Sequence, residues 1–145
     1  MRDVVIFASE KVKEAELPNV LFICGDAAAL TALLDEKSLE TIYINFCDPW
    51  PKARHAKRRL TSEGFLRLFK GLLADDGKIE FKTDNIGLFE FSLEELPKAG
   101  YEMRDVSFDL HASKLSEGNV QTEYERNFSA KVFKINRLEA FKQEK

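Results

Sequence analysis

The segment best suited to chemistry is Asp48-Pro-Trp-Pro51, which places a carboxylate beside an indole between two prolines. Each proline ring fixes its own φ angle and favours extended backbone at the residue before it, here Asp48 and Trp50. An aromatic ring offers a stacking surface, and a carboxylate accepts hydrogen bonds from ring N–H and amino groups. The segment therefore indicates a rigid loop that binds a flat, hydrogen-bonding ring. The alternative is a structural proline-rich turn around a core tryptophan.

A basic run follows this loop directly. Residues 52–59 contain five lysines and arginines and no acid, so residues 48–59 carry a net charge of +4. Because the whole chain carries −3, the remainder carries −7. A run of charges is usually a solvated surface, but this one has no neighbouring acid with which to form surface ion pairs. Basic side chains beside an aromatic ring are typical of proteins that hold looped or single-stranded RNA. The run therefore predicts a phosphate-binding strip.

Apolar patterning predicts alternating strands and helices that would position this loop. We expect one domain over residues 1–145, built on an open and largely parallel sheet. Strands are expected at 20–24, 41–46, 78–83, 101–110 and 131–141. Helices are expected at 4–15, 27–35 and 86–97, and from 61–64 onward, where Thr61 or Ser62 would cap the helix. A turn is expected at 75–77.

Three of the predicted strands are each followed by an aspartate, namely Asp26, Asp48 and Asp84. Ligands of open α/β sheets bind beyond the carboxyl ends of the strands. A single aspartate in such a place is usually a helix cap or a turn residue. Three aspartates at one sheet edge favour a ligand site.

Length and cysteine usage exclude several classes of protein. No apolar run approaches the roughly 18 residues that a membrane helix needs, and residues 1–10 do not resemble a signal peptide. Cys24 and Cys47 each stand alone in apolar surroundings. We therefore expect reduced, buried thiols in a cytoplasmic protein, with neither a disulfide framework nor a metal site.

Three motifs together resemble the bacterial tRNA (guanine-N7)-methyltransferase family. They are Asp48-Pro-Trp-Pro-Lys-Ala-Arg-His-Ala-Lys-Arg-Arg59, Phe81-Lys-Thr-Asp-Asn85 and Thr122-Glu-Tyr-Glu125. They occur in the family's order and at about its spacing, and the resemblance covers nearly the whole chain. It implies S-adenosylmethionine as the methyl donor, tRNA as the partner, and transfer of the methyl group to N7 of guanine 46.

The resemblance also implies roles for individual residues. Asp48 matches the active-site aspartate, which lies near both the donor and the target base, and Asp26 matches a position that meets the adenosine part of the donor. Lys52 and Asp84 match substrate-contacting positions. The other matched positions contact RNA (Arg54, His55, Ala56, Lys57, Arg58 and Arg59) or close over the substrate (Thr122, Glu123, Tyr124 and Glu125).

The chemistry of such a transfer suits these side chains. Guanine N7 already has a free lone pair, so the enzyme mainly has to align N7 with the methyl group. Carboxylates offset the positive charge that spreads over the ring as the bond forms. A Cys/His or Ser/His pair is therefore not needed, and we interpret His55 and His111 as partners of phosphate or backbone groups.

The resemblance implies a Rossmann-like class I methyltransferase fold, a three-layer α/β/α arrangement. The chain departs from that pattern because it lacks the Gly-rich donor loop and the first two strands. Residues 20–24 would then lose both neighbouring strands, and an open edge of this kind is prone to association. We therefore expect either a fragment of a longer enzyme, or a chain that rearranges or pairs with another chain, for example as a homodimer.

Two alternatives from other classes remain. The first is a non-catalytic RNA-binding remnant of the family, which keeps the basic run but not the donor site. The second is a flavodoxin-like α/β protein that binds another nucleotide. The missing phosphate loop and the basic run both count against the second alternative.

Overall fold

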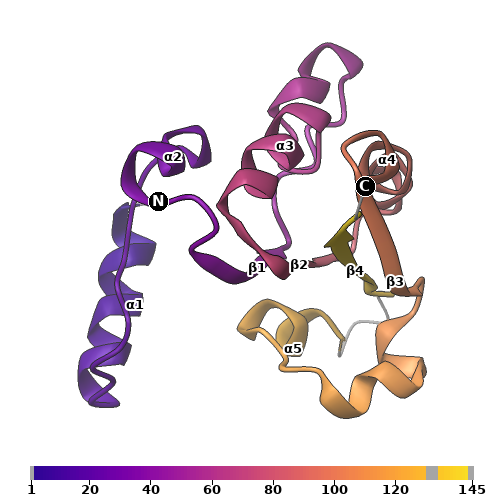
Figure 1. The fold of residues 1–145 in the computed structure, drawn as a ribbon. Coiled ribbons are helices and arrows are strands. Elements are labelled where there is room, and N and C mark those ends of the chain that lie inside the picture. Colours follow the sequence, from indigo (N-terminus) through magenta and orange to yellow (C-terminus); the bar gives the residue numbers. More distant parts are fainter. Residues whose placement is uncertain (1, 130–133, 144–145) are drawn as a thin grey trace. The chain divides into compact units, whose positions relative to one another are not determined.

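A computed structural model describes residues 2–129 and 134–143 (Figure 1). The chain divides into two compact units, residues 1–33 and residues 34–145. The single domain expected over residues 1–145 stays a prediction. Within the described residues, no helix has the length and apolar character needed to cross a membrane.

The first unit contains α1 (Arg2–Glu14), the 3-10 turn η1 (Ala27–Ala29) and the short helix α2 (Leu30–Leu33). The helices expected at 4–15 and 27–35 are confirmed, although the second is shorter and begins as a 3-10 turn. The strand expected at 20–24 is wrong: these residues join no sheet of the described chain, and Leu21 is 95% exposed. An apolar run becomes a strand only where neighbouring strands supply hydrogen bonds.

The second unit is built on a four-stranded sheet. Its strands are β1 (Leu39–Asn45), β2 (Leu73–Thr83), β3 (Tyr101–Ser107) and β4 (Asn136–Lys142), in the order β1-β2-β4-β3. β1 and β2 are parallel, whereas β4 is antiparallel to both β2 and β3. β1, β2 and β3 share one direction, but in the described chain β4 lies between β2 and β3 and makes two of the three pairings antiparallel, so the sheet is mixed rather than largely parallel as expected. The predicted start of the last strand, at 131, lies outside the described residues.

The turn expected at 75–77 lies inside β2 as an irregularity of the strand. Leu39 pairs with Leu73, whereas Thr41, two residues further on, already pairs with Lys78. β2 therefore carries extra residues opposite β1, as in a β-bulge. A Cβ atom at Gly77 would lie 2.9 Å from the Ala74 carbonyl oxygen, so the backbone approaches itself too closely for a side chain there.

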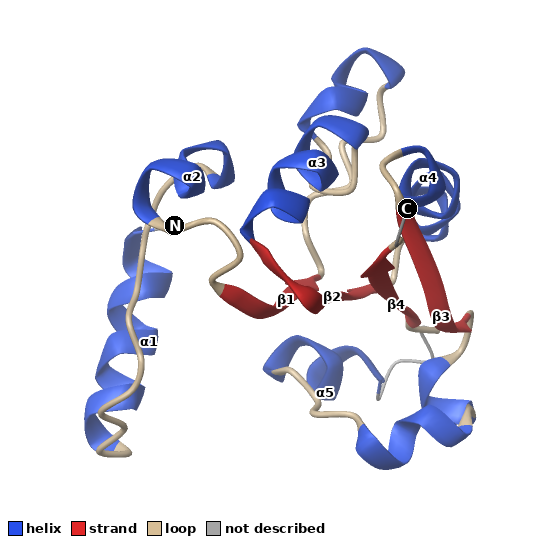
Figure 2. Cartoon of the chain, in the orientation of Figure 1, coloured by secondary structure: helices blue, strands red, loops and turns tan. Residues whose placement is uncertain are grey.

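One face of the sheet is covered by α3 (Glu63–Leu72) and α4 (Ile86–Lys98), as Figure 2 shows. Leu66 of α3 and Phe89 of α4 are completely buried, as is Phe81 of β2. The Phe81 and Phe89 rings are stacked at a centroid distance of 6.1 Å. Burial of aromatic and aliphatic side chains on this face supplies the hydrophobic core.

The ends of these helices differ in how they are capped. The Asn85 side chain caps α4 by accepting a hydrogen bond from the Leu88 N–H at 2.8 Å. Ser62 precedes α3, but its side chain does not cap the helix; its hydroxyl donates to the Lys57 carbonyl at 3.3 Å. The expected hydroxyl cap is therefore wrong for Ser62. α4 continues one residue past Pro97, which lies in its last turn.

The opposite face of the sheet is polar. Along β2, Ile79 and Phe81 are buried in the core, and the alternating Lys78, Glu80 and Lys82 lie on the other side. A sheet with apolar layers on both faces would have a continuously apolar strand here. Over this polar face lie the 3-10 helices η3 (Leu110–Ala112) and η4 (Lys114–Gly118) and the helix α5 (Glu123–Ser129), visible in Figure 1.

Candidate functional site

Asp48 and Asp84 follow the carboxyl ends of two paired parallel strands. Asp48 comes three residues after β1, and Asp84 comes directly after β2. The Phe46 N–H donates to the Lys82 carbonyl at 2.9 Å, so the pairing continues one residue beyond β1. Asp26 lies in the first unit, where its carboxylate accepts from the Ala28 N–H at 2.9 Å as the cap of η1.

The segment that carries Asp48 is strained. Phe46 and Trp50 have φ angles of 53° and 43°, in the left-handed region that bulky side chains avoid. Residues held in such a conformation cost about 1–3 kcal/mol each and tend to occur at functional sites. The extended backbone expected at Trp50 is therefore wrong. Asp48 itself is exposed between these two positions.

Arg59 holds this strained segment in place. Its Nε donates to the carbonyls of Pro49 and Trp50, each at 3.1 Å, and its Nη2 donates to the Trp50 carbonyl at 2.9 Å. The guanidinium also lies 4.4 Å from the centre of the Phe91 ring, on α4. Arg59, expected to contact RNA, is therefore already engaged in fixing the loop.

Trp50 is half-buried against the basic run. The Arg58 guanidinium lies 5.1 Å from the centre of the indole, and the His55 ring meets it edge-on at 5.5 Å. The indole ring packs against η2 (Ala53–Arg58). Its packing helps to fix the short 3-10 helix beside Asp48.

The residues of the basic run differ in their exposure to solvent. Lys52, Arg54, Lys57 and Arg58 are exposed, whereas His55 and Ala56 are half-buried. In the part of the chain that the structure describes, no ion pair involves these four cations. The surface of η2 thus presents unneutralised positive charge beside Asp48.

Tyr124 of α5 connects the ends of the two strands. Its hydroxyl donates to Asp84 Oδ2 at 2.7 Å, and its ring lies 4.5 Å from that of Phe46. The hydrogen bond to Asp84 raises the pKa of Tyr124 to about 12, with burial and the charge of Asp84 adding to the effect. Asp84, Tyr124 and Phe46 therefore form one polar and aromatic corner.

The Thr122-Glu-Tyr-Glu125 motif forms a capping box at the start of α5. The Glu125 N–H donates to Thr122 Oγ1 at 3.1 Å, and the Thr122 N–H donates to Glu125 Oε1 at 3.2 Å. These reciprocal bonds satisfy two backbone donors that a helix start leaves open. Two members of the motif thus have a structural role, whereas Tyr124 reaches the strand ends.

Glu125 is the centre of a buried polar cluster. Lys82 Nζ donates to Oε1, while Asn119 Nδ2 (3.1 Å) and His111 Nε2 (3.0 Å) contact Oε2. Burial by itself would raise the pKa of Glu125, but the hydrogen bonds from Lys82, His111, the Thr122 backbone and Asn119 outweigh it and lower the pKa. The side chain is 0% exposed. A direct contact of this carboxylate with a substrate, as the resemblance implies, does not fit such burial.

Lys82 is a residue of the site for which residue patterns predict no role. Its ammonium also donates to Asn119 Oδ1 (3.1 Å) and to the Val120 carbonyl (3.0 Å), and its side chain is only 9% exposed. A charge buried to this extent needs partners. The signal in the sequence was a lysine inside an apolar strand, although its partners lie 37 to 43 residues further along the chain.

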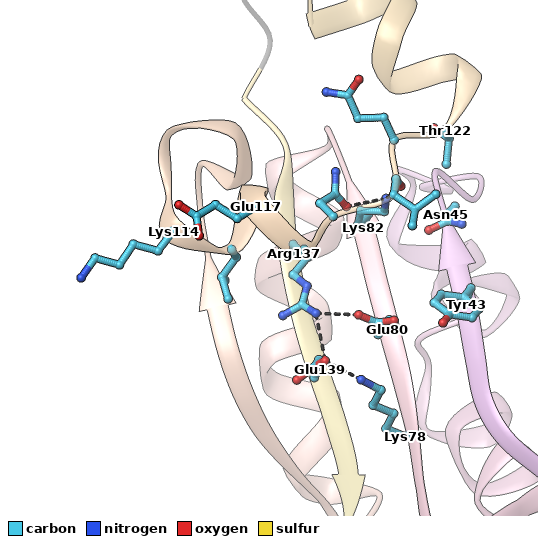
Figure 3. Close-up of a pocket in the computed structure, with 15 residues that line it drawn as sticks. Tyr43, Asn45, Lys78, Glu80, Lys82, Lys114, Glu117, Thr122, Arg137 and Glu139 are labelled. Atoms are coloured by element: carbon cyan, nitrogen blue, oxygen red, sulfur yellow. Dashed lines mark hydrogen bonds and ion pairs between the residues drawn. The ribbon is translucent and has the colours of Figure 1, made fainter.

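A cavity of about 860 Å³ opens on the polar face of the sheet. Figure 3 shows its floor, where Arg137 bonds to Glu80 (2.6 Å) and Glu139 (2.9 Å), and Lys78 bonds to Glu139 (2.7 Å). Thr122 and Lys82 lie at one end of the cavity. The charges of the floor are paired with one another, so the polar face is stable without a covering core.

The described residues beside Asp48 form no candidate metal site, and of the two thiols expected to be buried, Cys47 is half-buried and Cys24 is exposed. Among the described residues, no group of three or more histidine, cysteine and acidic side chains could hold a metal ion. Burial raises the pKa of the neighbouring Cys47 thiol to about 11, so the thiol stays protonated near neutral pH. The arrangement offers carboxylates, aromatic rings and cations, which suit binding and alignment of a substrate.

Known structures share this fold. The chain matches the cyclase SpnF with a TM-score of 0.62 (16% identity, 97% of this chain and 64% of that one). It matches the antibiotic-resistance methyltransferase Kmr at 0.53 (19% identity, 88% and 63%) and a SAM-dependent methyltransferase from Archaeoglobus fulgidus at 0.51 (13% identity, 86% and 68%). Identities this low show the fold alone. The expected Rossmann-like class I methyltransferase fold is confirmed.

Sequence relatives are much closer. The tRNA (guanine-N(7)-)-methyltransferase of Brevibacillus brevis is 46% identical over 95% of this chain and 64% of that protein. That of Macrococcus caseolyticus is 47% identical over 96% of this chain and 66% of that protein. The chain thus spans slightly less than two thirds of the length of these relatives. The resemblance drawn from the three motifs is confirmed.

A family model described as "Putative methyltransferase" matches residues 1–138, nearly the whole chain. The matched range includes the strained Asp48 segment, the basic run, and the corner formed by Asp84 and Tyr124. The chain therefore belongs to this methyltransferase family.

Proposed function

We propose that the chain acts in a tRNA (guanine-N7)-methyltransferase, in which a methyl group passes from S-adenosylmethionine to N7 of guanine 46. One observation carries the proposal: an exposed carboxylate, Asp48, in a strained segment between an unneutralised basic surface and the Asp84–Tyr124 corner. A base placed there would be reached by carboxylates while its phosphates met cations. The names of the relatives supply the substrate and the reaction.

The base site is assigned to the two strand ends. Asp84 accepts hydrogen bonds from the N1–H and amino group of guanine, and Lys52 binds the substrate from the start of the basic run. Tyr124 and Thr122, with Glu123 beside them, form the wall on the α5 side. Recognition of an unstacked base in a tRNA loop commonly combines base-edge hydrogen bonds with aromatic contacts.

The RNA strip consists of the exposed part of η2, with Arg54, Lys57 and Arg58 as the phosphate partners. For His55, Ala56 and Arg59 the proposed role is indirect, because they are half-buried and Arg59 is bonded to the loop backbone. Phosphate contacts supply affinity and orientation, while contacts to the base supply selectivity.

In the second unit, the donor side is assigned to Asp48. S-adenosylmethionine supplies an electrophilic methyl group on a sulfonium sulfur. The exposed Asp48 carboxylate suits a group that carries positive charge, and the proposal assigns to it the alignment of the N7 lone pair with the methyl group. As N7 is methylated, the ring becomes positive, and Asp48 offsets that charge. Contact of Asp26, in the first unit, with the adenosine part stays a prediction. We also propose a cytoplasmic location and, as an open alternative to a monomer, a homodimer.

Calorimetry with S-adenosylmethionine and filter binding with tRNA test the two halves of this proposal. We expect the 145-residue chain to bind tRNA and, because it lacks the Gly-rich donor loop, to bind S-adenosylmethionine only weakly, with Asp48→Ala weakening donor binding further and leaving the tRNA affinity unchanged. The matched control is Asp109→Ala, a change of an aspartate outside the site. Binding of tRNA without any heat from the donor would support the non-catalytic remnant, and binding of neither would reject both functions.

A further inference from the structure

The helix that carries Tyr124 is too short to be positioned by its own stability. α5 has seven residues, fewer than an isolated helix needs in water. Its location therefore depends on tertiary contacts. Glu125, in the first turn of α5, is buried and contacts Lys82, His111 and Asn119.

Two elements contact this carboxylate through its two different oxygens. Lys82, on β2, bonds to Oε1, and His111, on η3, contacts Oε2 at 3.0 Å. Asn119 accepts a hydrogen bond from Lys82 and donates one to Glu125. The carboxylate is thus fixed in position and in rotation.

The strand that supplies Lys82 ends one residue before Asp84. Only Thr83 separates them in the chain, and only the peptide bond separates Glu125 from Tyr124. The Lys82–Glu125 pair therefore joins α5 to the end of β2, and the Tyr124–Asp84 bond (2.7 Å) joins α5 to the residue that directly follows β2. A displacement of α5 by about 1 Å would break the second bond, because hydrogen bonds are lost beyond about 3.5 Å.

We propose that Lys82 and His111 are positioning residues of the base site: through Glu125 they hold α5 so that Tyr124 stays against Asp84 and Phe46. The inference rests on the proposed function only where it concerns the base. In that site the Tyr124–Asp84 bond fixes the orientation of the carboxylate that reads guanine. Neither Lys82 nor His111 touches the substrate.

Three variants test the inference. His111→Ala removes the contact of the imidazole with Glu125, whereas His111→Gln supplies a side-chain amide that can donate a hydrogen bond over a similar distance. Ser113→Ala is the matched control, since it removes a hydrogen bond of the same segment (to the Leu110 carbonyl, 2.8 Å) without touching Glu125. Each is measured as the full chain, below the temperature at which circular dichroism shows unfolding.

The first readout needs no RNA. Tyrosine labelled with ¹³C at Cζ gives a signal for Tyr124, identified by its loss in Tyr124→Phe. At about pH 10, where an ordinary tyrosine is half ionised, the wild type, His111→Gln and Ser113→Ala should keep Tyr124 protonated. In His111→Ala, the Tyr124 hydroxyl should be partly ionised at this pH. An unchanged Tyr124 signal in His111→Ala would overturn the inference.

The second readout is the ratio of affinities for tRNA with guanine and with adenine at position 46. We expect His111→Ala to lower this ratio about tenfold, the value of one hydrogen bond to a charged group, and His111→Gln to restore it. If the ratio falls as much in Ser113→Ala as in His111→Ala, the role of His111 is merely structural. A wild type that does not prefer guanine would reject the proposed base site, while the Tyr124 signal would still decide the positioning role.

Discussion

At the scale of single residues, the basic loop contains two kinds of arginine. Arg54 is exposed, and no described ion pair involves it, whereas Arg59 donates three hydrogen bonds to the carbonyls of Pro49 and Trp50. Their neighbouring positions in one basic run conceal this difference. Sequence could predict that the run was basic and exposed in part, but the bonds of Arg59 depend on the folded path of the loop.

We therefore predict opposite effects for two substitutions. Arg54→Ala should weaken tRNA binding and reduce its salt dependence by about one phosphate contact, with stability unchanged. Arg59→Ala should lower the free energy of unfolding by about 2 kcal/mol, because the strained Trp50 loses charge-assisted hydrogen bonds. Filter binding at several salt concentrations and urea denaturation would check both. Equal stability of the two variants would contradict the structural role of Arg59.

The Tyr124–Asp84 hydrogen bond predicts how the stability of the protein depends on pH. The pKa of Tyr124 is raised to about 12 by the bond to Asp84, against about 10 in the unfolded chain. This contribution to stability is therefore complete below about pH 10 and is lost as the pH rises from there towards 12. Tyr124→Phe should be less stable than the wild type near neutral pH, and the difference should shrink over this range. Urea denaturation at a series of pH values measures it, with the exposed Tyr43→Phe as control. A constant difference would contradict the bond.

At the scale of elements, the strands and helices that follow from local residue patterns were the most predictable. β1, the core half of β2, and α3 and α4 follow from their apolar residues and lie within a few residues of the expected ranges. Residues 20–24 have the same apolar character but form no strand, because pairing depends on neighbours that local sequence does not specify. The turn residues 75–77 are likewise present, although the strand continues through them.

The candidate site was predictable where its residues are local. The loop at Asp48 and the exposed half of the basic run could be read from residue types. The cluster around Glu125 could not, since Lys82 and His111 come from other elements. The Thr122–Glu125 spacing is itself a capping-box signature, and it was interpreted only as a substrate motif. Residue spacing alone does not distinguish the two roles.

The capping box predicts how α5 responds to changes at Thr122. Thr122→Ala removes the acceptor for the Glu125 N–H and should lower the free energy of unfolding by about 1 kcal/mol. Thr122→Ser keeps a hydroxyl and should remain close to the wild type. Chemical denaturation of the two variants checks this. If serine destabilises as much as alanine, the methyl group rather than the hydroxyl of Thr122 is what matters.

At the scale of the whole molecule, the first unit exposes apolar surface. Leu21 is 95% exposed, and Ile23 and Phe7 are exposed by 57% and 65%. Exposed apolar side chains in an unpaired extended segment favour association. We predict concentration-dependent self-association, which Leu21→Lys should reduce without changing the melting temperature. Sedimentation velocity measures it, with Thr31→Lys in the same unit as control. A wild type that stays monomeric at all concentrations would contradict the prediction.

The central claim concerns the reaction itself, and transfer of a labelled methyl group tests it most directly. The chain is incubated with tRNA and methyl-labelled S-adenosylmethionine, and the tRNA is digested to nucleosides. We predict label in 7-methylguanosine, a loss of label by at least about a hundredfold in Asp48→Ala, and no label when adenine replaces guanine 46. Label that is unchanged in Asp48→Ala, or absent from a wild type that binds both substrates, would contradict the account.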